Sequence, residues 1–244
     1  MNKLILFLSL ALLLPACTTI PADSSLFKVK YNALMGKTKT EAAVIDIKQF
    51  KELQNLASTD REQMQAELAL AYAYYRNRQF DICIKQIEAF ARKHTSYPHL
   101  DYVLYLRALA TKASGKQQFL KAVSHLSENS PYPEKLRLAY TYFVDLITRY
   151  PKSEYSAQAL NLMKNIRTNL AAYEMFLARY EQVNRRYKEV IRRTEYVLEF
   201  YKGTPVVDDA YELQAKAYRA LGNVKKAEEV ERQQKQAERS SASN

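Results

Sequence analysis

Beyond the first 25 residues, apolar positions recur every three or four residues, the spacing that gathers them on one face of an α-helix. The chain has only four glycines, and proline is absent between Asp23 and Tyr97, so few positions break a helix. Within Met64 to Ala91, the apolar positions stop at a polar break over Arg76 to Gln79 and resume at Phe80. The pattern predicts an all-α chain, with a helix hairpin over this segment.

Small and aromatic residues stand at the positions that tetratricopeptide hairpins use for packing. Such hairpins carry Leu-Gly-x-x-Tyr on the first helix and Ala-x-x-x-Phe on the second, with a period of about 34 residues. Leu70, Ala71 and Tyr74 match the first pattern, and Cys83 with Ile87 matches the second. Further matches are Ala43 with Ile47, Ala139 with Phe143, Leu177 and Ala178 with Val190, and Ala215 and Tyr218 with Ala227. We predict a tetratricopeptide-repeat superhelix of about five helix hairpins, in which Cys83 is structural.

The middle repeats carry additional chain, because their small-residue positions lie further apart than that period. One addition is the polar stretch Ser124 to Pro133, and another is an extended helix through Tyr155 to Tyr180. We therefore divide the body into an N-terminal half at 26–115, a polar connection at 116–133 and a C-terminal half at 134–233. The tail at 234–244 has almost nothing to bury and is predicted to be disordered.

The N-terminus has the pattern of an export signal. Lys3 precedes an apolar run from Leu4 to Leu14, about half of the roughly 20 residues that a membrane-spanning helix needs. Ala16 and Cys17 follow the run, as in the bacterial lipobox, where the cysteine becomes acylated. We expect residues 1–16 to be removed, Cys17 to carry lipid and residues 17–25 to form a flexible tether. A secretory signal in which Cys17 is incidental is the alternative.

The formal net charge of the chain is +11, so anionic partners are favoured. A basic surface can bind nucleic acid, but an exported and lipid-tethered protein meets anionic headgroups and acidic proteins instead, which makes nucleic acid a less favoured partner. Once Cys17 is acylated, Cys83 is the only remaining thiol and no intramolecular disulfide can form. Packing must then stabilise the fold.

Reactive groups are sparse in this sequence. The three histidines, at positions 94, 99 and 125, form no metal-ligand spacing with cysteine or with one another, so we predict no metal site. Isolated glycines exclude a Gly-rich phosphate loop. Asp208 and Asp209 follow Pro205 and are better explained as carboxylates at a helix N-terminus than as a catalytic pair. We predict a binding protein, not an enzyme, with no cofactor besides the covalent lipid.

Tyrosine and arginine clusters are the candidates for recognition, since the chain has 19 tyrosines and such residues often dominate interfaces. Tyr72, Tyr75 and Arg76 are predicted to face a concave groove, together with Tyr102 and Tyr105 from the next aromatic cluster. Packing of these rings in the core is the alternative. A basic cluster comprises Arg185, Arg186, Lys188, Arg192 and Arg193, which forms either a solvated helix face or a docking surface for an acidic partner.

Three stretches carry a resemblance to a known family: Ala71 to Asn77, Tyr97 to Leu109 and Arg149 to Tyr155. Their order and spacing are similar to those of the BamD family, also called ComL or YfiO, the lipoproteins of the outer-membrane β-barrel assembly machinery. The resemblance spans most of the chain after Cys17. It departs from the family in the segment Ala113 to Pro133, which lacks a Gly- and Asp-rich loop, and in the first repeat.

The resemblance implies five tetratricopeptide repeats on a lipid-anchored scaffold at the periplasmic face of the outer membrane. Its implied partners are the barrel component with POTRA domains, other assembly lipoproteins and unfolded outer-membrane proteins awaiting folding and insertion. Arg193 aligns with a family arginine that contacts the barrel component, and Arg192 and Glu195 flank it. Thr18 after Cys17 is consistent with sorting to the outer membrane. The alternatives are a pilot or cell-wall scaffold on similar repeats, and a basic competence lipoprotein that contacts DNA.

Overall fold

The computed structural model describes residues 26–40, 44–122 and 131–242, and within them it contains ten helices and no strand. The helices are α1 (Leu26–Lys37), α2 (Ile47–Leu56), α3 (Asp60–Arg76), α4 (Phe80–Lys93), α5 (Leu100–Ala122), α6 (Pro131–Arg149), α7 (Ser156–Val183), α8 (Tyr187–Phe200), α9 (Val207–Ala220) and α10 (Val224–Ala242). The predicted signal peptide, Cys17, the tether and the Ala43 position lie outside the described residues.

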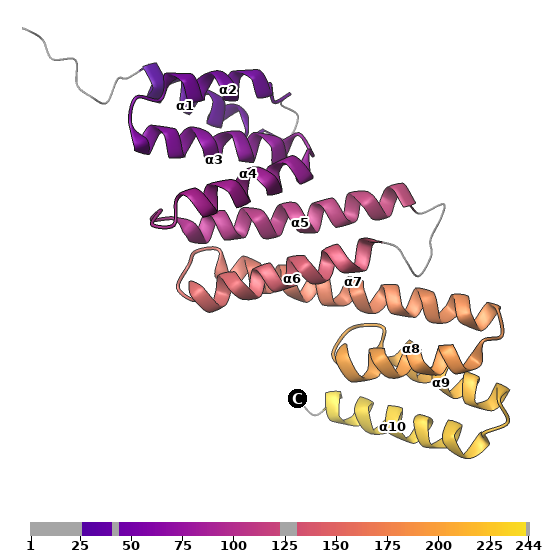
Figure 1. Cartoon of the computed structure of the whole chain (residues 1–244). Coiled ribbons are helices and arrows are strands. Elements are labelled where there is room, and N and C mark those ends of the chain that lie inside the picture. Colours follow the sequence, from indigo (N-terminus) through magenta and orange to yellow (C-terminus); the bar gives the residue numbers. More distant parts are fainter. Residues whose placement is uncertain (1–25, 41–43, 123–130, 243–244) are drawn as a thin grey trace, which may run out of the picture.

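The described helices run back and forth and stack in chain order, from α1 at one end to α10 at the other (Figure 1). Each helix contacts the helix before it and the helix after it. The helices pair in order as five hairpins, from α1 with α2 to α9 with α10. The prediction of an all-α tetratricopeptide-repeat superhelix is confirmed.

The small residues of the repeat pattern are buried in the hydrophobic clusters between helices. Cys83, Ala139, Val190 and Ala227 are fully buried, each at 0% exposure. Burial raises the pKa of the Cys83 thiol to about 12, so the thiol stays protonated and unreactive. Cys83 is therefore a packing residue, as its place in the repeat predicts.

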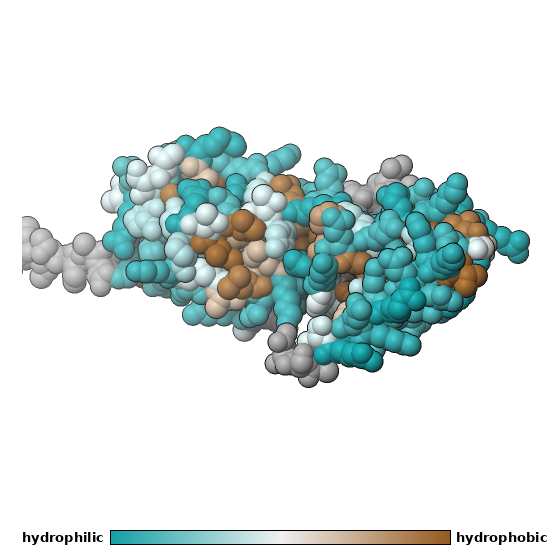
Figure 2. Space-filling model, turned by 90° about the horizontal axis from the view of Figure 1, so that it is seen from below, coloured by the Kyte–Doolittle hydropathy of each residue, from teal (hydrophilic) through white to brown (hydrophobic). Residues whose placement is uncertain are grey.

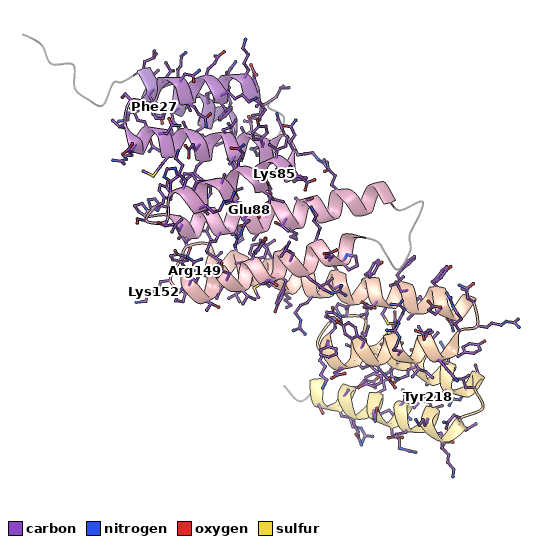
Figure 3. All side chains as sticks on the ribbon, in the orientation of Figure 1. Phe27, Lys85, Glu88, Arg149, Lys152 and Tyr218 are labelled. Carbon is purple, nitrogen blue, oxygen red and sulfur yellow. The ribbon has the colours of Figure 1, made fainter. Side chains whose placement is uncertain are left out.

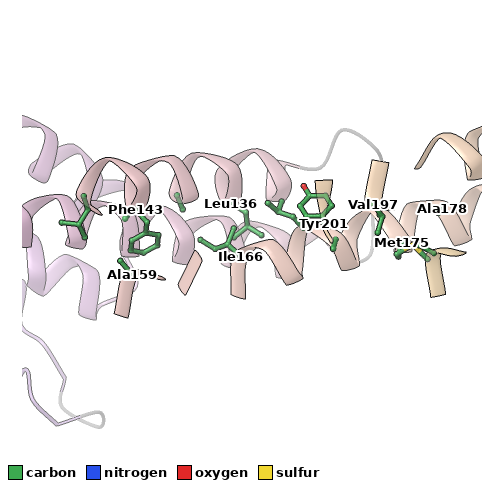
Figure 4. Packing of buried hydrophobic residues seen from close by; sticks show 14 of the residues in the cluster. Leu136, Phe143, Ala159, Ile166, Met175, Ala178, Val197 and Tyr201 are labelled. Carbon is green, nitrogen blue, oxygen red and sulfur yellow. The ribbon is translucent and has the colours of Figure 1, made fainter. Parts of the chain in front are cut away.

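Two hydrophobic cores share helix α5. Val103, Leu106 and Ala110 pack into the N-terminal core, and Leu104 and Tyr105 pack into the C-terminal core. Buried side chains of α6 and α7, among them Leu136, Phe143, Ala159 and Ile166, continue the C-terminal core (Figure 4). Because opposite sides of one continuous helix are buried, the two halves of the chain meet within α5.

The connection between the halves is shorter than predicted. Helix α5 continues to Ala122 and α6 begins at Pro131, so both ends of the predicted connection at 116–133 are helical. Lys116, Gln117 and Gln118 are good helix formers, and proline is well tolerated as the first residue of a helix. Residues 123–130, which remain between the helices, lie outside the described part of the chain.

Two further predictions concern long helical segments. The expected extension through Tyr155 to Tyr180 is confirmed, because α7 is a helix of 28 residues.

The predicted disorder of the tail is wrong up to Ala242, where α10 ends. Residues 234–239, Gln-Lys-Gln-Ala-Glu-Arg, are all good helix formers, and their high helix propensity extends α10 without a buried face.

None of the described helices combines the length and the apolar composition needed to cross a membrane. On the face seen in Figure 2, hydrophobic areas are small and separated by hydrophilic surface. That face therefore presents several separate apolar areas.

Candidate aromatic binding site

A cavity of about 260 Å³ opens between α1, α3 and α5 in the N-terminal half, and we call it the tyrosine cavity. It is lined by Tyr31, Met35, Gln65, Leu68, Ala69, Tyr72, Tyr97, His99, Tyr102 and Tyr155. Half of these residues are tyrosines, contributed by three helices and by the turns before α5 and α7. The cavity thus gathers rings that are far apart in the sequence.

The start of α3 is held by two hydrogen bonds that involve side chains. The Thr59 hydroxyl oxygen accepts a hydrogen bond from the backbone N–H of Glu62 at 3.2 Å. The Glu62 carboxylate in turn accepts one from the backbone N–H of Ser58 at 2.8 Å. These two bonds satisfy N–H groups that the first turn of a helix leaves without helical partners. They fix the start of α3, the helix that carries Tyr72.

Tyr72 and Tyr102 lie in the cavity wall, as the sequence predicts. Leu70, Ala71 and Tyr74 are buried against neighbouring helices, which leaves Tyr72 half-buried at the cavity. The ring of Tyr102 lies 5.8 Å from the ring of Tyr155, and burial raises the pKa of Tyr102 well above its ordinary value. Tyr102 is therefore a neutral phenol at physiological pH.

Tyr75 and Arg76 do not line the tyrosine cavity. The Tyr75 ring stacks on Tyr72 at 6.1 Å and packs against Phe80 at 5.7 Å, so it supports the cavity wall from behind. The Arg76 guanidinium donates a hydrogen bond to the Thr40 carbonyl at 2.9 Å. The prediction that Arg76 faces the groove is wrong, because its side chain reaches back to the chain that follows α1.

Tyr105 belongs to the core and not to the groove. Its side chain is 6% exposed, and its ring stacks on Tyr155 at 4.8 Å and packs against Phe143 at 6.1 Å. Burial raises the pKa of Tyr105 to about 12. The prediction of a groove residue is corrected, because α5 buries two sides and Tyr105 points toward α6. Its contribution to the cavity is to hold Tyr155 in place.

Four further cavity residues were not predicted from the sequence: Tyr31, Tyr97, His99 and Tyr155. Three of them, Tyr97, His99 and Tyr155, stand in the stretches that resemble the BamD family. Their position in these stretches was the feature of the sequence that could have identified them as cavity residues. Residues in turns have no helical periodicity that would reveal the direction of their side chains. Tyr31 lies on α1, where no comparable motif marks it.

The tyrosine cavity is rich in aromatic side chains, and no Asp, Glu, Lys or Arg side chain lines it. Burial raises the pKa of Tyr31, Tyr97 and Tyr102, which keeps the three phenols protonated as hydrogen-bond donors and acceptors. Pockets for whole small molecules measure about 300–1,000 Å³, so this smaller space fits one or two side chains of a peptide. Stacking and phenol hydrogen bonds would hold an aromatic side chain there.

The basic cluster at the start of α8 and along it is divided between exposed and buried residues. Arg192 is exposed and donates to Glu189 at 2.8 Å, and Arg186 pairs with Glu181. The side chain of Arg193 is only 7% exposed and donates to Glu174 of α7 at 3.2 Å. Arg193 therefore lies between α7 and α8, while its predicted role in docking a partner stays a prediction.

Glu195 lies at a separate cavity of about 450 Å³ between α8, α9 and α10. The hydroxyl of Tyr218 on α9, labelled in Figure 3, donates to the Glu195 carboxylate at 3.3 Å. The ammonium of Lys226 lies 5.4 Å from the centre of the Tyr218 ring. Arg192 and Glu195, both exposed, are thus available to a partner beside the buried Arg193.

Residues 22–233 match the model of the family YfiO, described as outer membrane lipoprotein. The chain is 30% identical over 241 residues to the outer membrane protein assembly factor BamD of Neisseria meningitidis serogroup A, a match that covers 95% of this chain and 90% of that protein. It is 26% identical over 194 residues to BamD of Buchnera aphidicola, covering 79% and 77%. For Vibrio cholerae BamD, the identity is 28% over 158 residues, or 65% of each chain.

Proposed function

This chain belongs to the YfiO family of outer membrane lipoproteins, and we propose that it is a scaffold of the machinery that folds and inserts outer-membrane proteins. In this proposal it is a binding protein and not an enzyme. It binds unfolded segments of outer-membrane proteins with its N-terminal half. Its C-terminal half docks on the POTRA-containing barrel component, beside other assembly lipoproteins.

The observation that carries the proposal is the tyrosine cavity. Strands of transmembrane barrels alternate lipid-facing apolar residues with polar ones and are flanked by aromatic girdles. An unfolded barrel segment therefore offers aromatic side chains at intervals, and the cavity of Tyr72 and Tyr102 is sized for one or two of them. Because the lining tyrosines are neutral, the cavity accepts such side chains irrespective of the charge of the segment.

Docking of the C-terminal half is proposed at the exposed part of α8. Arg192 and Glu195 are accessible there, whereas Arg193 lies beneath them against Glu174. A buried arginine cannot contact a partner directly without moving, so Arg193 acts by fixing the position of α8. Rim charges such as Arg192 mainly affect association rate and salt dependence.

We infer from the sequence that Cys17 carries the lipid that anchors the scaffold to the periplasmic face of the outer membrane. A single acyl chain gives only marginal membrane binding, and stable anchoring takes more than one signal. Acylation of both the thiol and the new amino terminus of Cys17 would supply the necessary chains. Residues 18–25 would then act as the tether.

Purification of the full chain from membranes with its partners tests the proposed function. Recovery of a POTRA-containing barrel protein supports it. Recovery of a secretin or of peptidoglycan would instead support a pilot or cell-wall scaffold, and salt-sensitive retention of DNA would support a competence role. The Arg192→Glu variant should recover less of the barrel protein, and its recovery should depend less on salt, because an attractive rim charge has been removed.

A further inference from the structure

A second aromatic cavity, of about 290 Å³, lies between α6, α7 and α8, and we call it the arginine cavity. It is lined by Arg137, Tyr140, Thr141, Arg167, Leu170, Tyr196, Phe200 and Tyr201. It shares no residue with the tyrosine cavity and draws its lining from the C-terminal half. The sequence analysis assigned no role to any of these residues.

The aromatic rings of the arginine cavity are held in place by one another. The Tyr196 ring lies 4.8 Å from the Phe200 ring and 5.7 Å from the Tyr201 ring. Phe200 is nevertheless 53% exposed, which is high for a phenylalanine in a ring cluster. The cavity therefore presents an ordered apolar surface to solvent.

Arg167 places positive charge at the same cavity. Its guanidinium donates to the carbonyl oxygens of Phe200 and Lys202, at 3.2 and 3.4 Å. These acceptors are neutral, so the contacts orient the guanidinium without cancelling its charge. The Phe200 carbonyl is the last of α8 and Lys202 lies in the turn that follows, so Arg167 stands at the C-terminal end of α8, where cations interact favourably with the helix dipole.

Arg137 places a second guanidinium at the arginine cavity, and it shares the carboxylate of Glu174 with Arg193. Arg137 donates to Glu174 at 3.3 Å, and Glu174 also accepts from the buried Arg193 at 3.2 Å. The Arg137 side chain is about half exposed, whereas that of Glu174 is 11% exposed. Arg137 and Arg193 thus share the Glu174 carboxylate, and Arg137 lies in the wall of the arginine cavity next to the aromatic rings.

We propose that the arginine cavity binds an extended segment of a partner protein in which an aromatic side chain stands next to an acidic one. The rings take the aromatic side chain, and Arg137 or Arg167 forms a charge-assisted hydrogen bond with the carboxylate. The volume fits one or two side chains and is small for a whole ligand. This site selects for negative charge, whereas the tyrosine cavity does not, so the proposal goes beyond the function proposed above.

A peptide suits this site better than a single-stranded nucleic acid. Nucleic-acid grooves track the backbone with a row of cations beside stacked bases. Here Glu195 and Glu199 stand exposed on α8, the helix that carries Tyr196 and Phe200. Their carboxylates would repel a phosphate backbone that continued along α8, whereas a short acidic and aromatic segment needs to reach only the cavity.

The test uses the full chain in detergent and a nonapeptide of alternating Asp and Phe, with one Phe replaced by photoreactive benzoylphenylalanine. Crosslinks located by mass spectrometry should fall in α6 and α8. Phe200→Ala should weaken peptide binding about tenfold or more, and Arg167→Gln should weaken it and flatten its salt dependence. Phe176→Ala is the control, because Phe176 is an exposed aromatic residue of α7 outside the cavity.

A second peptide with Lys in place of Asp should crosslink to the arginine cavity at least tenfold less. The Tyr72→Ala variant separates the two sites, because it should remove crosslinks in α3 and α5 and retain those in α6 and α8. The proposal is overturned if the Lys peptide labels α6 and α8 equally, if Phe200→Ala binds as tightly as Phe176→Ala, or if a ten-residue oligothymidylate displaces the Asp peptide. None of these results would depend on docking to the barrel component.

Discussion

Glu174 on α7 accepts a hydrogen bond from Arg193 on α8 at 3.2 Å, and both side chains are nearly inaccessible to solvent. The pair joins the two helices of the fourth hairpin below the surface that we propose as the docking site. An arginine that resembles a partner-contacting residue of the family is thus held by an internal carboxylate. Its removal should change stability as well as binding.

We expect Arg193→Ala to lower the free energy of unfolding by about 3 kcal/mol, since breaking a buried ion pair typically costs about 3–5 kcal/mol and Glu174 keeps Arg137 as a partner. The control is Arg192→Ala, whose exposed pair with Glu189 should contribute less than about 1 kcal/mol. Urea denaturation followed by circular dichroism measures both. Equal effects of the two substitutions would show that the Glu174 contact does not stabilise the fold.

Tyr72→Ala and Tyr105→Ala should have opposite consequences, because one ring lines the tyrosine cavity and the other lies in the core. Tyr105→Ala should cost about 3–5 kcal/mol of stability, the usual range for a large aromatic residue removed from a core. Tyr72→Ala should leave the melting temperature within a few degrees but weaken binding of an unfolded barrel peptide about tenfold. A thermal melt and a peptide titration of each variant measure the stability and the affinity. If the Tyr72→Ala protein binds the peptide as tightly as the parent, the tyrosine cavity has no part in the proposed function.

The ionised carboxylate of Glu67 should stabilise the N-terminal half, and this stabilisation should be lost in acid. Burial opposes ionisation of this carboxyl, but hydrogen bonds from Lys93 at 2.7 Å and His94 at 2.8 Å outweigh it and lower its pKa. The stabilisation is therefore present above the unfolded-state pKa of about 4.3 and is lost as the pH falls through the lower folded-state value. Glu67→Gln should be less stable than the parent at pH 7 and equally stable at the acid end, in denaturant titrations at each pH. A constant difference across that range would rule out this origin.

Cys17→Ala should abolish membrane retention, since the predicted lipid is the anchor. Metabolic labelling with a radioactive fatty acid, followed by separation of membranes from soluble protein, measures both acylation and retention. Cys83→Ala is the control, because the buried Cys83 thiol has a pKa near 12 and should not be acylated. Acyl labelling of the Cys17→Ala protein at the parent's level would refute the lipobox assignment.

Much of the architecture follows from local sequence. The spacing of apolar residues places Cys83, Ala139 and Val190 in helix contacts, because helical periodicity assigns a face to each residue without knowledge of the neighbouring helix. The break over Arg76 to Gln79 and the long α7 were equally visible. The tail showed the limit of this reasoning, since high helix propensity extended α10 where the lack of apolar residues suggested disorder.

The tertiary structure decided which face each recognition residue occupies. Tyr105 is core because α5 is covered on two sides, and Arg193 is buried because α7 brings Glu174 against α8 across a separation of 19 residues. The tyrosine cavity likewise exists because Tyr31, Tyr72 and Tyr155, which come from different repeats, line the same space. Periodicity states only that a residue lies on one side of its own helix. Whether that side meets solvent, a cavity or another helix depends on contacts between repeats, which no local pattern encodes.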